Sequence, residues 1–290
     1  RLPDRKVDWY WLKKYFVDEV IKVDAKLLIT VDCWIKDFEI VEYANQKWLD
    51  VIITDHHNVP EKIPNAIAVL NPKRNDCNYP FSWIAGVWVA FKLISTLLKE
   101  FFPDEKESKK YLIETLDIVA LWTVADCMNL VDENRIIVKY WLEQIKKSRS
   151  KWIAKLIEDK LEHDLDADIF WFLIWPKINA AGRLSTPYKA VNLILNNWDT
   201  LDEVLYEIED LNNKRKQISS DYFQKAIDEI NHSDNLLLYW DKDIEHWIIW
   251  IISWKITENY FKPSIVYKIE EDKIVASCRS PYYFDIHECL

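Results

Sequence analysis

The sequence predicts an α/β protein: a parallel-sheet domain, then a helical connector, then the beginning of a second α/β domain. Three observations indicate this fold class. Strand and helix patterns alternate over residues 27–70, helical patterns dominate residues 84–230, and strand patterns return after His232. We expect domains over residues 1–135, 136–230 and 231–290, the first truncated at its N-terminal side and the last at its C-terminal side.

The N-terminal region predicts three strands. Leu27–Val31 is a short apolar run bounded by Asp32, Phe38–Lys47 has helical spacing, and Val51–Thr54 is a second apolar run. A third run, Ala66–Leu70, is stopped by an Asn-Pro pair. Strand, helix and strand at this spacing are typical of a parallel sheet, and the continuously apolar strands predict burial of both sheet faces.

The rest of the chain predicts mainly helices before strands return. A long amphipathic helix is expected over Leu201–Ile230, with apolar residues three or four positions apart. The other expected helices are Ile84–Phe102, Tyr111–Leu121, Asn134–Ile145, Ile153–Lys160, Ala190–Leu195 and Ile248–Asn259, and the expected strands are Leu236–Tyr239, Ser264–Tyr267 and Ile274–Ala276.

Composition excludes several classes of protein. Half of the 290 residues are apolar and 30 % are charged, which is typical of globular chains, and no apolar run is long enough to span a membrane. The five cysteines contain no C-x-x-C pair, which argues against a disulfide framework and a structural zinc site. We therefore expect a cytoplasmic protein. The net charge of −10 argues only weakly against a nucleic-acid partner, because a local basic patch is sufficient for binding.

The counts of tryptophan and glycine are inverted. The chain has 16 Trp and 2 Gly, whereas glycine usually makes up about 7 % of residues. Several tryptophans stand where glycine is expected, as in Trp9-Tyr10-Trp11 and at Trp34 after the first strand. UGA is read as tryptophan in some genetic codes and as glycine in others. We therefore predict that many of these tryptophans stand for glycine, and that they occupy exposed, crowded or positive-φ positions.

Acidic and histidine side chains follow the first two strands. Asp32 comes directly after Leu27–Val31, and Asp55-His56-His57 comes directly after Val51–Thr54. Parallel strands end at the same sheet edge, so these residues are expected side by side, where open α/β sheets bind ligands. Asp126 follows an apolar helix and adds a third group. Carboxylates with imidazole suit Mn²⁺ or Mg²⁺, although a single Asp after a strand is more often a turn or capping residue.

The motifs around these residues resemble those of the DHH phosphoesterase superfamily. With Trp read as Gly, residues 31–34 give V-D-C-G, residues 55–57 give D-H-H, and residues 121–126 end in G-T-V-A-D. Within that superfamily, N-A-A-G-R-L at 179–184 and A-G-V-W-V-A-F-K at 85–92 resemble the RecJ single-strand exonucleases. Pro3-Asp4-Arg5, followed by residues 9–11, adds to this likeness, which runs nearly end to end.

The resemblance implies a function and roles for individual residues. It implies a metal-dependent, 5′-to-3′ exonuclease for single-stranded DNA in repair and recombination, with two Mn²⁺ or Mg²⁺ ions. It further implies contacts with a single-strand-binding protein and a helicase. The implied metal ligands are Asp32, His56 and Asp126, with His57 as an orienting or phosphate-contacting partner. The implied substrate contacts are Asn179, Arg183, Arg279 and Ser280, the last two in a companion DHHA1-like domain.

Some family features are missing from the chain. The first motif, D-x-D-x-D-G, and the C-terminal G-G-H motif are absent, so we expect a piece of a longer protein with an incomplete active site. Two other functions stay open: a DHH enzyme for oligoribonucleotides, cyclic dinucleotides or pyrophosphate, and a non-catalytic DHH scaffold. Candidates for a basic DNA groove, equally typical of solvated helix faces, are Lys146, Lys147, Arg149, Lys151 and Lys214-Arg215-Lys216.

Overall fold

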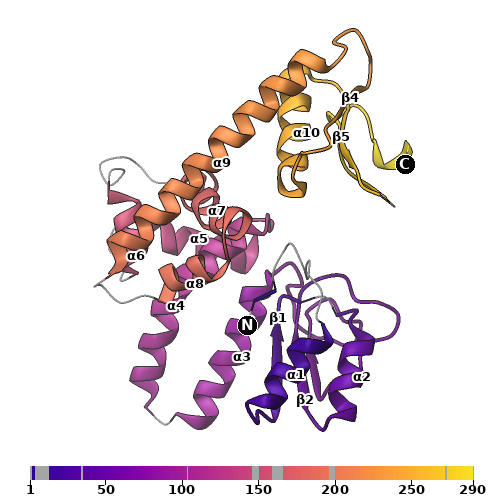
Figure 1. Ribbon diagram of the computed structural model, residues 1–290. Helices are drawn as coiled ribbons and strands as arrows, with labels where there is room; N and C mark the ends of the chain where they lie inside the picture. Colours follow the sequence, from indigo (N-terminus) through magenta and orange to yellow (C-terminus); the bar gives the residue numbers. More distant parts are fainter. Residues whose placement is uncertain are drawn as a thin grey trace. The chain divides into compact units, whose positions relative to one another are not determined.

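A computed structural model describes residues 2–3, 13–33, 35–102, 104–145, 150–158, 166–195, 200–271 and 273–289. The chain forms two compact units. The first contains residues 1–182 and 186–205, and the second contains residues 183–185 and 206–290. Each unit has its own sheet (Figure 1). Among the described residues, no helix combines the length and the apolar character needed to cross a bilayer.

The sheet of the first unit is parallel, as predicted. Its strands are β1 (Leu27–Val31), β2 (Asp50–Thr54) and β3 (Ala68–Leu70), in the order β1-β2-β3. Val31 pairs with Thr54, and Thr54 pairs with Leu70, so the three carboxyl ends are level. Helices α1 (Lys14–Lys22) and α2 (Phe38–Gln46) pack on this sheet through a core that includes Val17, Val41 and Ile53.

The prediction that both sheet faces are buried is wrong for β1. Leu27, Ile29 and Val31 are 44 %, 41 % and 48 % exposed, whereas Thr30 on the opposite face is buried. Successive strand residues point to opposite faces, so a single uncovered face exposes every second side chain. An apolar strand pattern reports what the side chains are, but not which elements cover them.

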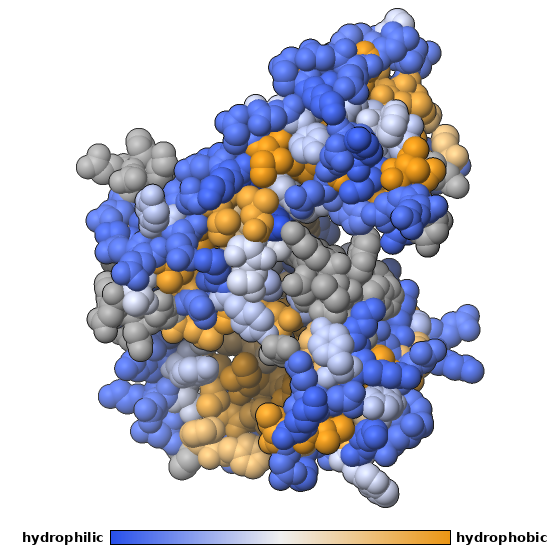
Figure 2. All heavy atoms as spheres, in the orientation of Figure 1, coloured by the Kyte–Doolittle hydropathy of each residue, from blue (hydrophilic) through white to orange (hydrophobic). Residues whose placement is uncertain are grey.

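Helices complete the first unit. They are α3 (Gly86–Phe101), α4 (Glu105–Ala125), α5 (Asp132–Gln144), α6 (Lys151–Leu156), α7 (Trp175–Leu184) and α8 (Tyr188–Leu195), with a π-helical segment, η3 (Ile169–Ile174), leading into α7. In Figure 2, apolar side chains gather on the surface over α3, which exposes Ile94, Leu97 and Phe101.

Helices α4 and α7 differ most from the sequence prediction. Helix α4 begins six residues before Tyr111, because the Asp104 carboxylate caps it by accepting hydrogen bonds from the Lys106 and Glu107 amides, both at 3.0 Å. Helix α7 was not predicted. It contains the whole run 179–184, which carries the implied substrate contacts Asn179 and Arg183.

The second unit begins within α9 (Leu201–Glu229) and has a mixed sheet. Its strands are β4 (Leu237–Trp240), β5 (Ser264–Ile269) and β6 (Ile274–Arg279), with β4 and β5 parallel and β5 and β6 antiparallel. Helix α10 (His246–Tyr260) crosses between β4 and β5, and a 3-10 turn, His287–Cys289, lies near the end of the chain. Ile248, Ile252 and Ile256 of α10 form the core with β4 and β5.

The tryptophans partly follow the predicted pattern. Nine of the twelve described tryptophans are exposed or half-buried, and three are buried. The expectation of several positive φ angles is wrong, since Trp48 is the single case among the described tryptophans. Trp48 follows α2 at φ 60° with 92 % exposure, a helix-ending position that favours glycine. The predictions for Trp9, Trp11, Trp34 and Trp198 lie outside the described residues.

A buried tryptophan gives a second indication that some tryptophans fit their positions poorly. Trp141 is 3 % exposed, and its indole N–H has no hydrogen-bond partner. A buried Trp normally places this group against an acceptor. Trp88 does so, donating to Glu133 Oε2 at 3.0 Å. The tryptophans are therefore not uniformly accommodated by the fold.

Candidate metal centre

The level carboxyl ends of β1 and β2 position the first two predicted groups. The Asp32 amide donates to the Thr54 carbonyl at 2.9 Å, and the Asp55 amide donates to the Leu70 carbonyl at 3.0 Å. Asp32 then turns out of the strand at φ 56°, a left-handed conformation that costs energy for a residue with a Cβ. Such strain is common where a side chain must be aimed at a ligand.

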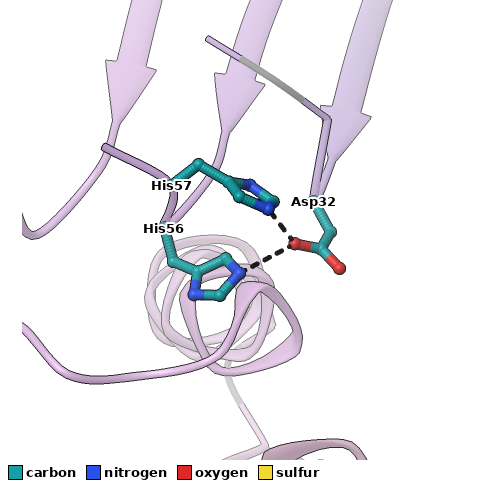
Figure 3. A group of neighbouring side chains, drawn as sticks. All are labelled: Asp32, His56 and His57. Atoms are coloured by element: carbon teal, nitrogen blue, oxygen red, sulfur yellow. Dashed lines mark ion pairs between the residues drawn. The ribbon is translucent and has the colours of Figure 1, made fainter. Parts of the chain in front are cut away.

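Three of the predicted ligands converge on one point. His56 Nε2 lies 3.2 Å from Asp32 Oδ1 and 3.2 Å from Asp126 Oδ2. His57 Nδ1 lies 4.0 Å from Asp32 Oδ1, and Figure 3 shows both imidazoles turned toward the Asp32 carboxylate. Asp126 ends α4, so a helix C-terminus delivers the third group to the ends of the strands. Asp32, His56 and His57 each offer a ligand atom within 4.8 Å of the others.

Asp55 holds this arrangement in place, a role that sequence reasoning missed. Its fully buried carboxylate accepts hydrogen bonds from the backbone amides of Ile35 at 2.7 Å, His56 at 2.7 Å and His57 at 3.2 Å. It also contacts His57 Nδ1 at 2.7 Å, and an ionised carboxylate requires the proton to be on that nitrogen. Its position directly after a buried strand was the available signal.

Gly86 forms a wall of the site. A Cβ on Gly86 would lie 2.4 Å from Asp32 Oδ1 and 2.6 Å from its Cγ. The first residue of α3 can therefore have no side chain while Asp32 keeps this position. This contact explains why glycine is found at position 86 in a chain with only one other glycine.

Electrostatics of the cluster favour a cation. Burial opposes protonation of His56, but the adjacent Asp32 carboxylate and the charges of Asp126 and Asp55 outweigh it and raise the His56 pKa. Burial, with the charge of Asp32, raises the Asp126 pKa despite the opposing charge of His56. Both shifts show negative charge concentrated in a partly desolvated place.

Unsatisfied donor and acceptor atoms fit the same interpretation. His56 Nδ1 and Nε2 and Asp126 Oδ2 are buried without a hydrogen-bond partner. Orphaned buried polar atoms are rare in folded proteins. Two carboxylates and neutral imidazole form a mixed oxygen and nitrogen set that suits Mn²⁺ or Mg²⁺. These residues therefore fit a divalent cation.

The neighbouring cysteines do not fit as thiolate ligands. Burial, with the charges of Asp32, Asp37 and Asp55, raises the Cys33 pKa to about 11. Burial and the charge of Asp126 raise the Cys127 pKa as well. Because both shifts disfavour the thiolate form, oxygen and nitrogen atoms fit better as ligands here.

The predicted substrate contacts belong to other elements. Asn179 is half-buried in α7, and Arg183 is buried in the last turn of the same helix. Arg279 is exposed at the end of β6, with half-buried Ser280 beside it. Among the basic-groove candidates, Lys146, Lys147 and Arg149 lie outside the described residues, and Lys151 begins α6.

Comparison with known proteins agrees with this geometry. Residues 2–123, which include the runs at 31–34 and 55–57 and the first half of the run at 121–126, match the DHH family, N-terminal domain. The matched residues are similar to those of the DHH family. The D-H-H run that gives the family its name is residues 55–57, at the carboxyl end of β2.

Similar DHH proteins extend the likeness to the whole chain. The single-stranded-DNA-specific exonuclease RecJ of Bacillus subtilis is 31 % identical over 100 % of this chain, and RecJ of Escherichia coli is 32 % identical over 92 % of it. The chain spans 36 % and 49 % of the lengths of those two proteins.

Solved structures show the same fold. A crystal structure of exonuclease RecJ bound to manganese covers 99 % of this chain with a TM-score of 0.78 and 24 % identity, and the chain covers 71 % of it. RecJ in complex with Mn²⁺ from Thermus thermophilus covers 93 % of this chain with a TM-score of 0.77 and 25 % identity, and the chain covers 40 % of it. The predicted α/β class, with a DHH sheet followed by a second α/β unit, is confirmed.

Proposed function

We propose that this chain belongs to a metal-dependent exonuclease that hydrolyses phosphodiester bonds of single-stranded DNA from the 5′ end. The observation that carries the proposal is the meeting of Asp32, His56 and Asp126, with buried donor atoms that lack partners. The RecJ relatives support the choice of substrate, since they are named for single-stranded DNA.

The proposed ligands are Asp32, His56 and Asp126, and the proposed cofactor is a pair of Mn²⁺ or Mg²⁺ ions. Similar RecJ structures hold Mn²⁺ or Mg²⁺. When bound, such ions act as Lewis acids that activate water and stabilise charge on the phosphodiester oxygens. His56 must be neutral to ligate, so it loses the proton that the surrounding carboxylates favour in the metal-free chain.

The remaining residues have positioning and binding roles in this proposal. The Asp55 carboxylate fixes the His57 ring by accepting a hydrogen bond from its Nδ1–H group. His57 then orients His56 or contacts the scissile phosphate. Gly86 leaves room for the Asp32 carboxylate. The proposed phosphate contacts are Asn179, Arg183, Arg279 and Ser280.

The wider context is part of the same proposal. Residues 1–135 act as the DHH domain, 136–230 as a connector and 231–290 as a DHHA1-like domain. The protein works on single-stranded DNA in the cytoplasm, during repair and recombination, with a single-strand-binding protein and a helicase as partners.

Metal binding and strand digestion test the proposal separately. Titration of the chain with Mn²⁺ is expected to show binding that His56→Ala and Asp126→Asn each weaken at least tenfold, while Asp132→Asn leaves it unchanged. The protein expressed from its complete gene is then given single strands labelled at the 5′ or the 3′ end. Early release of the 5′ label, with Mn²⁺ required, is expected. Equal Mn²⁺ binding by all variants, or metal-independent digestion, would contradict the proposal.

A further inference from the structure

The three residues of the basic run Lys214-Arg215-Lys216 lie in helix α9 but have different surroundings. Lys214 pairs with Asp210 Oδ2 at 2.6 Å, one turn earlier, and Lys216 is exposed. Arg215 is instead half-buried. Of these three cations, Arg215 is therefore the one that is partly shielded from water.

Arg215 belongs to a polar stripe on α9. Asn212, Arg215 and Ser219 are three and four positions apart, so they share one helix face. Asn212 and Ser219 are 2 % and 3 % exposed. Lys255 of α10 meets this stripe, and its Nζ donates to Ser219 Oγ at 3.0 Å. Two helices of the second unit thus contribute four polar side chains to one place.

The two cations in this stripe have no acidic partner among the described residues. Arg215 Nε has no hydrogen-bond partner, and neither does Asn212 Oδ1. Burial lowers the pKa of Arg215. Burial and the nearby charge of Arg215 lower the pKa of Lys255. Partly buried like charges without a counter-ion are costly, and an oxyanion between them would remove that cost.

We propose that Asn212, Arg215, Ser219 and Lys255 bind a phosphate group of a single-stranded nucleic acid. Guanidinium and ammonium groups recognise phosphate oxygens, and the hydroxyl and amide supply further hydrogen bonds. Anion binding follows from the cluster itself, whereas the choice of a nucleic-acid phosphate rests on the proposed function. The site uses none of the metal-ligating residues, so it would hold the strand during cleavage rather than react with it.

Binding experiments in a chelator test this proposal without relying on catalysis. A fluorescent oligothymidylate is titrated with the wild-type chain and with Arg215→Gln, Lys255→Met and Lys242→Gln. Arg215→Gln and Lys255→Met are expected to weaken binding about tenfold each, because each removes a charge-assisted hydrogen bond. The slope of log affinity against log salt should fall by about 0.7 for each lost contact. Lys242→Gln, which removes an exposed lysine of the same unit outside the cluster, is the matched control and should leave the affinity unchanged.

A melting experiment separates a binding role from a structural one. Without ligand, Lys255→Met should melt no lower than the wild type, because it relieves repulsion between two cations. Inorganic phosphate should raise the melting temperature of the wild type but not that of Arg215→Gln. Stabilisation by inorganic phosphate with no loss of oligonucleotide affinity in either variant would overturn the nucleic-acid assignment. A destabilised Lys255→Met with wild-type affinity would show that the cluster is structural.

Failure of this inference can be told apart from failure of the proposed function. Loss of binding in the variants of a protein that digests no DNA would leave this site standing and contradict the nuclease. If the wild-type protein digests DNA and its Arg215→Gln and Lys255→Met variants bind and degrade strands normally, the nuclease proposal stands and this phosphate site is contradicted.

Discussion

The Asp32 carboxylate occupies the space where a Cβ of residue 86 would lie. The two atoms would be 2.4 Å apart, closer than any side chain tolerates. Since α3 begins at Gly86 and β1 ends beside Asp32, this contact fixes the helix against the end of the strand. The position of the Asp32 carboxylate therefore depends on the lack of a side chain at Gly86.

Gly86→Ala is expected to displace Asp32 and to weaken Mn²⁺ binding at least tenfold. Titration of Mn²⁺ measures the effect. Gly182→Ala is the matched control, because a Cβ there would meet nothing closer than Pro187 Cβ at 4.0 Å. Within helix α7 that control should stabilise the fold by about 0.5–1 kcal/mol. Equal Mn²⁺ affinity for both variants would show that Asp32 moves without cost.

Asp55→Asn is expected to lower both stability and metal affinity. The buried carboxylate accepts three backbone amides, and an amide side chain replaces one acceptor oxygen by a donor. We expect a loss on the order of 2 kcal/mol in unfolding free energy and a roughly ten- to hundredfold loss of Mn²⁺ affinity. Urea unfolding and Mn²⁺ titration check these values. Asp50→Asn, an exposed carboxylate in the same strand, should change neither.

Trp48→Gly is expected to stabilise the protein by about 1 kcal/mol, because glycine adopts positive φ without a Cβ clash. The indole is almost fully exposed, so little packing is lost. Trp48→Ala retains the Cβ and should remain near the wild type. Urea unfolding of the three proteins distinguishes the outcomes, and a destabilised Trp48→Gly would argue for an authentic tryptophan.

The mass of the protein isolated from its natural host tests the recoding prediction as a whole. Glycine at the UGA positions would lower the intact mass by the Trp–Gly difference for each recoded residue, and peptide mapping would locate them. Trp48 is the position where the structure most favours glycine, because its φ is positive and its side chain is exposed. A mass equal to that of the printed sequence, or UGG codons at those positions, would refute recoding.

Asp241 predicts an acid-sensitive second unit. Burial opposes its ionisation, but hydrogen bonds from Lys225 and the Asp243 amide outweigh burial and lower the Asp241 pKa. A lowered pKa contributes stability above the unfolded value, ordinarily 3.8, and that stability is lost as the pH falls through the folded value. Asp241→Asn should therefore melt below the wild type at pH 7, and the difference should shrink as the pH falls below 3.8 through the lowered folded pKa. A constant difference would exclude this linkage.

The sequence was sufficient to predict the strands and the site residues that follow them. The runs at 27–31 and 51–54 are continuously apolar and end at charged groups, so periodicity and chain order gave β1, β2 and the meeting of Asp32 with His56. Boundaries set by caps were less accurate, as Asp104 shows for α4. The roles proposed here for those site residues remain predictions.

Other features depend on contacts that periodicity does not contain. The role of Asp55 becomes clear only from the hydrogen bonds that its carboxylate accepts from backbone amides of two separate segments. The cluster on α9 and α10 joins residues about 40 positions apart, and only helix packing reveals that Arg215 and Lys255 are neighbours. Helix α7 was missed because it contains Pro176 and Gly182, residue types that usually mark a turn or a helix end.

The uncovered row of β1 bears on how the protein behaves in solution. Leu27, Ile29 and Val31 form an apolar strip on a strand that pairs on one side only among the described residues. Strips of this kind template strand addition between molecules. The net charge of −10 opposes such encounters at low ionic strength, and added salt screens that repulsion. Colloidal stability should therefore decline as salt and protein concentration rise together.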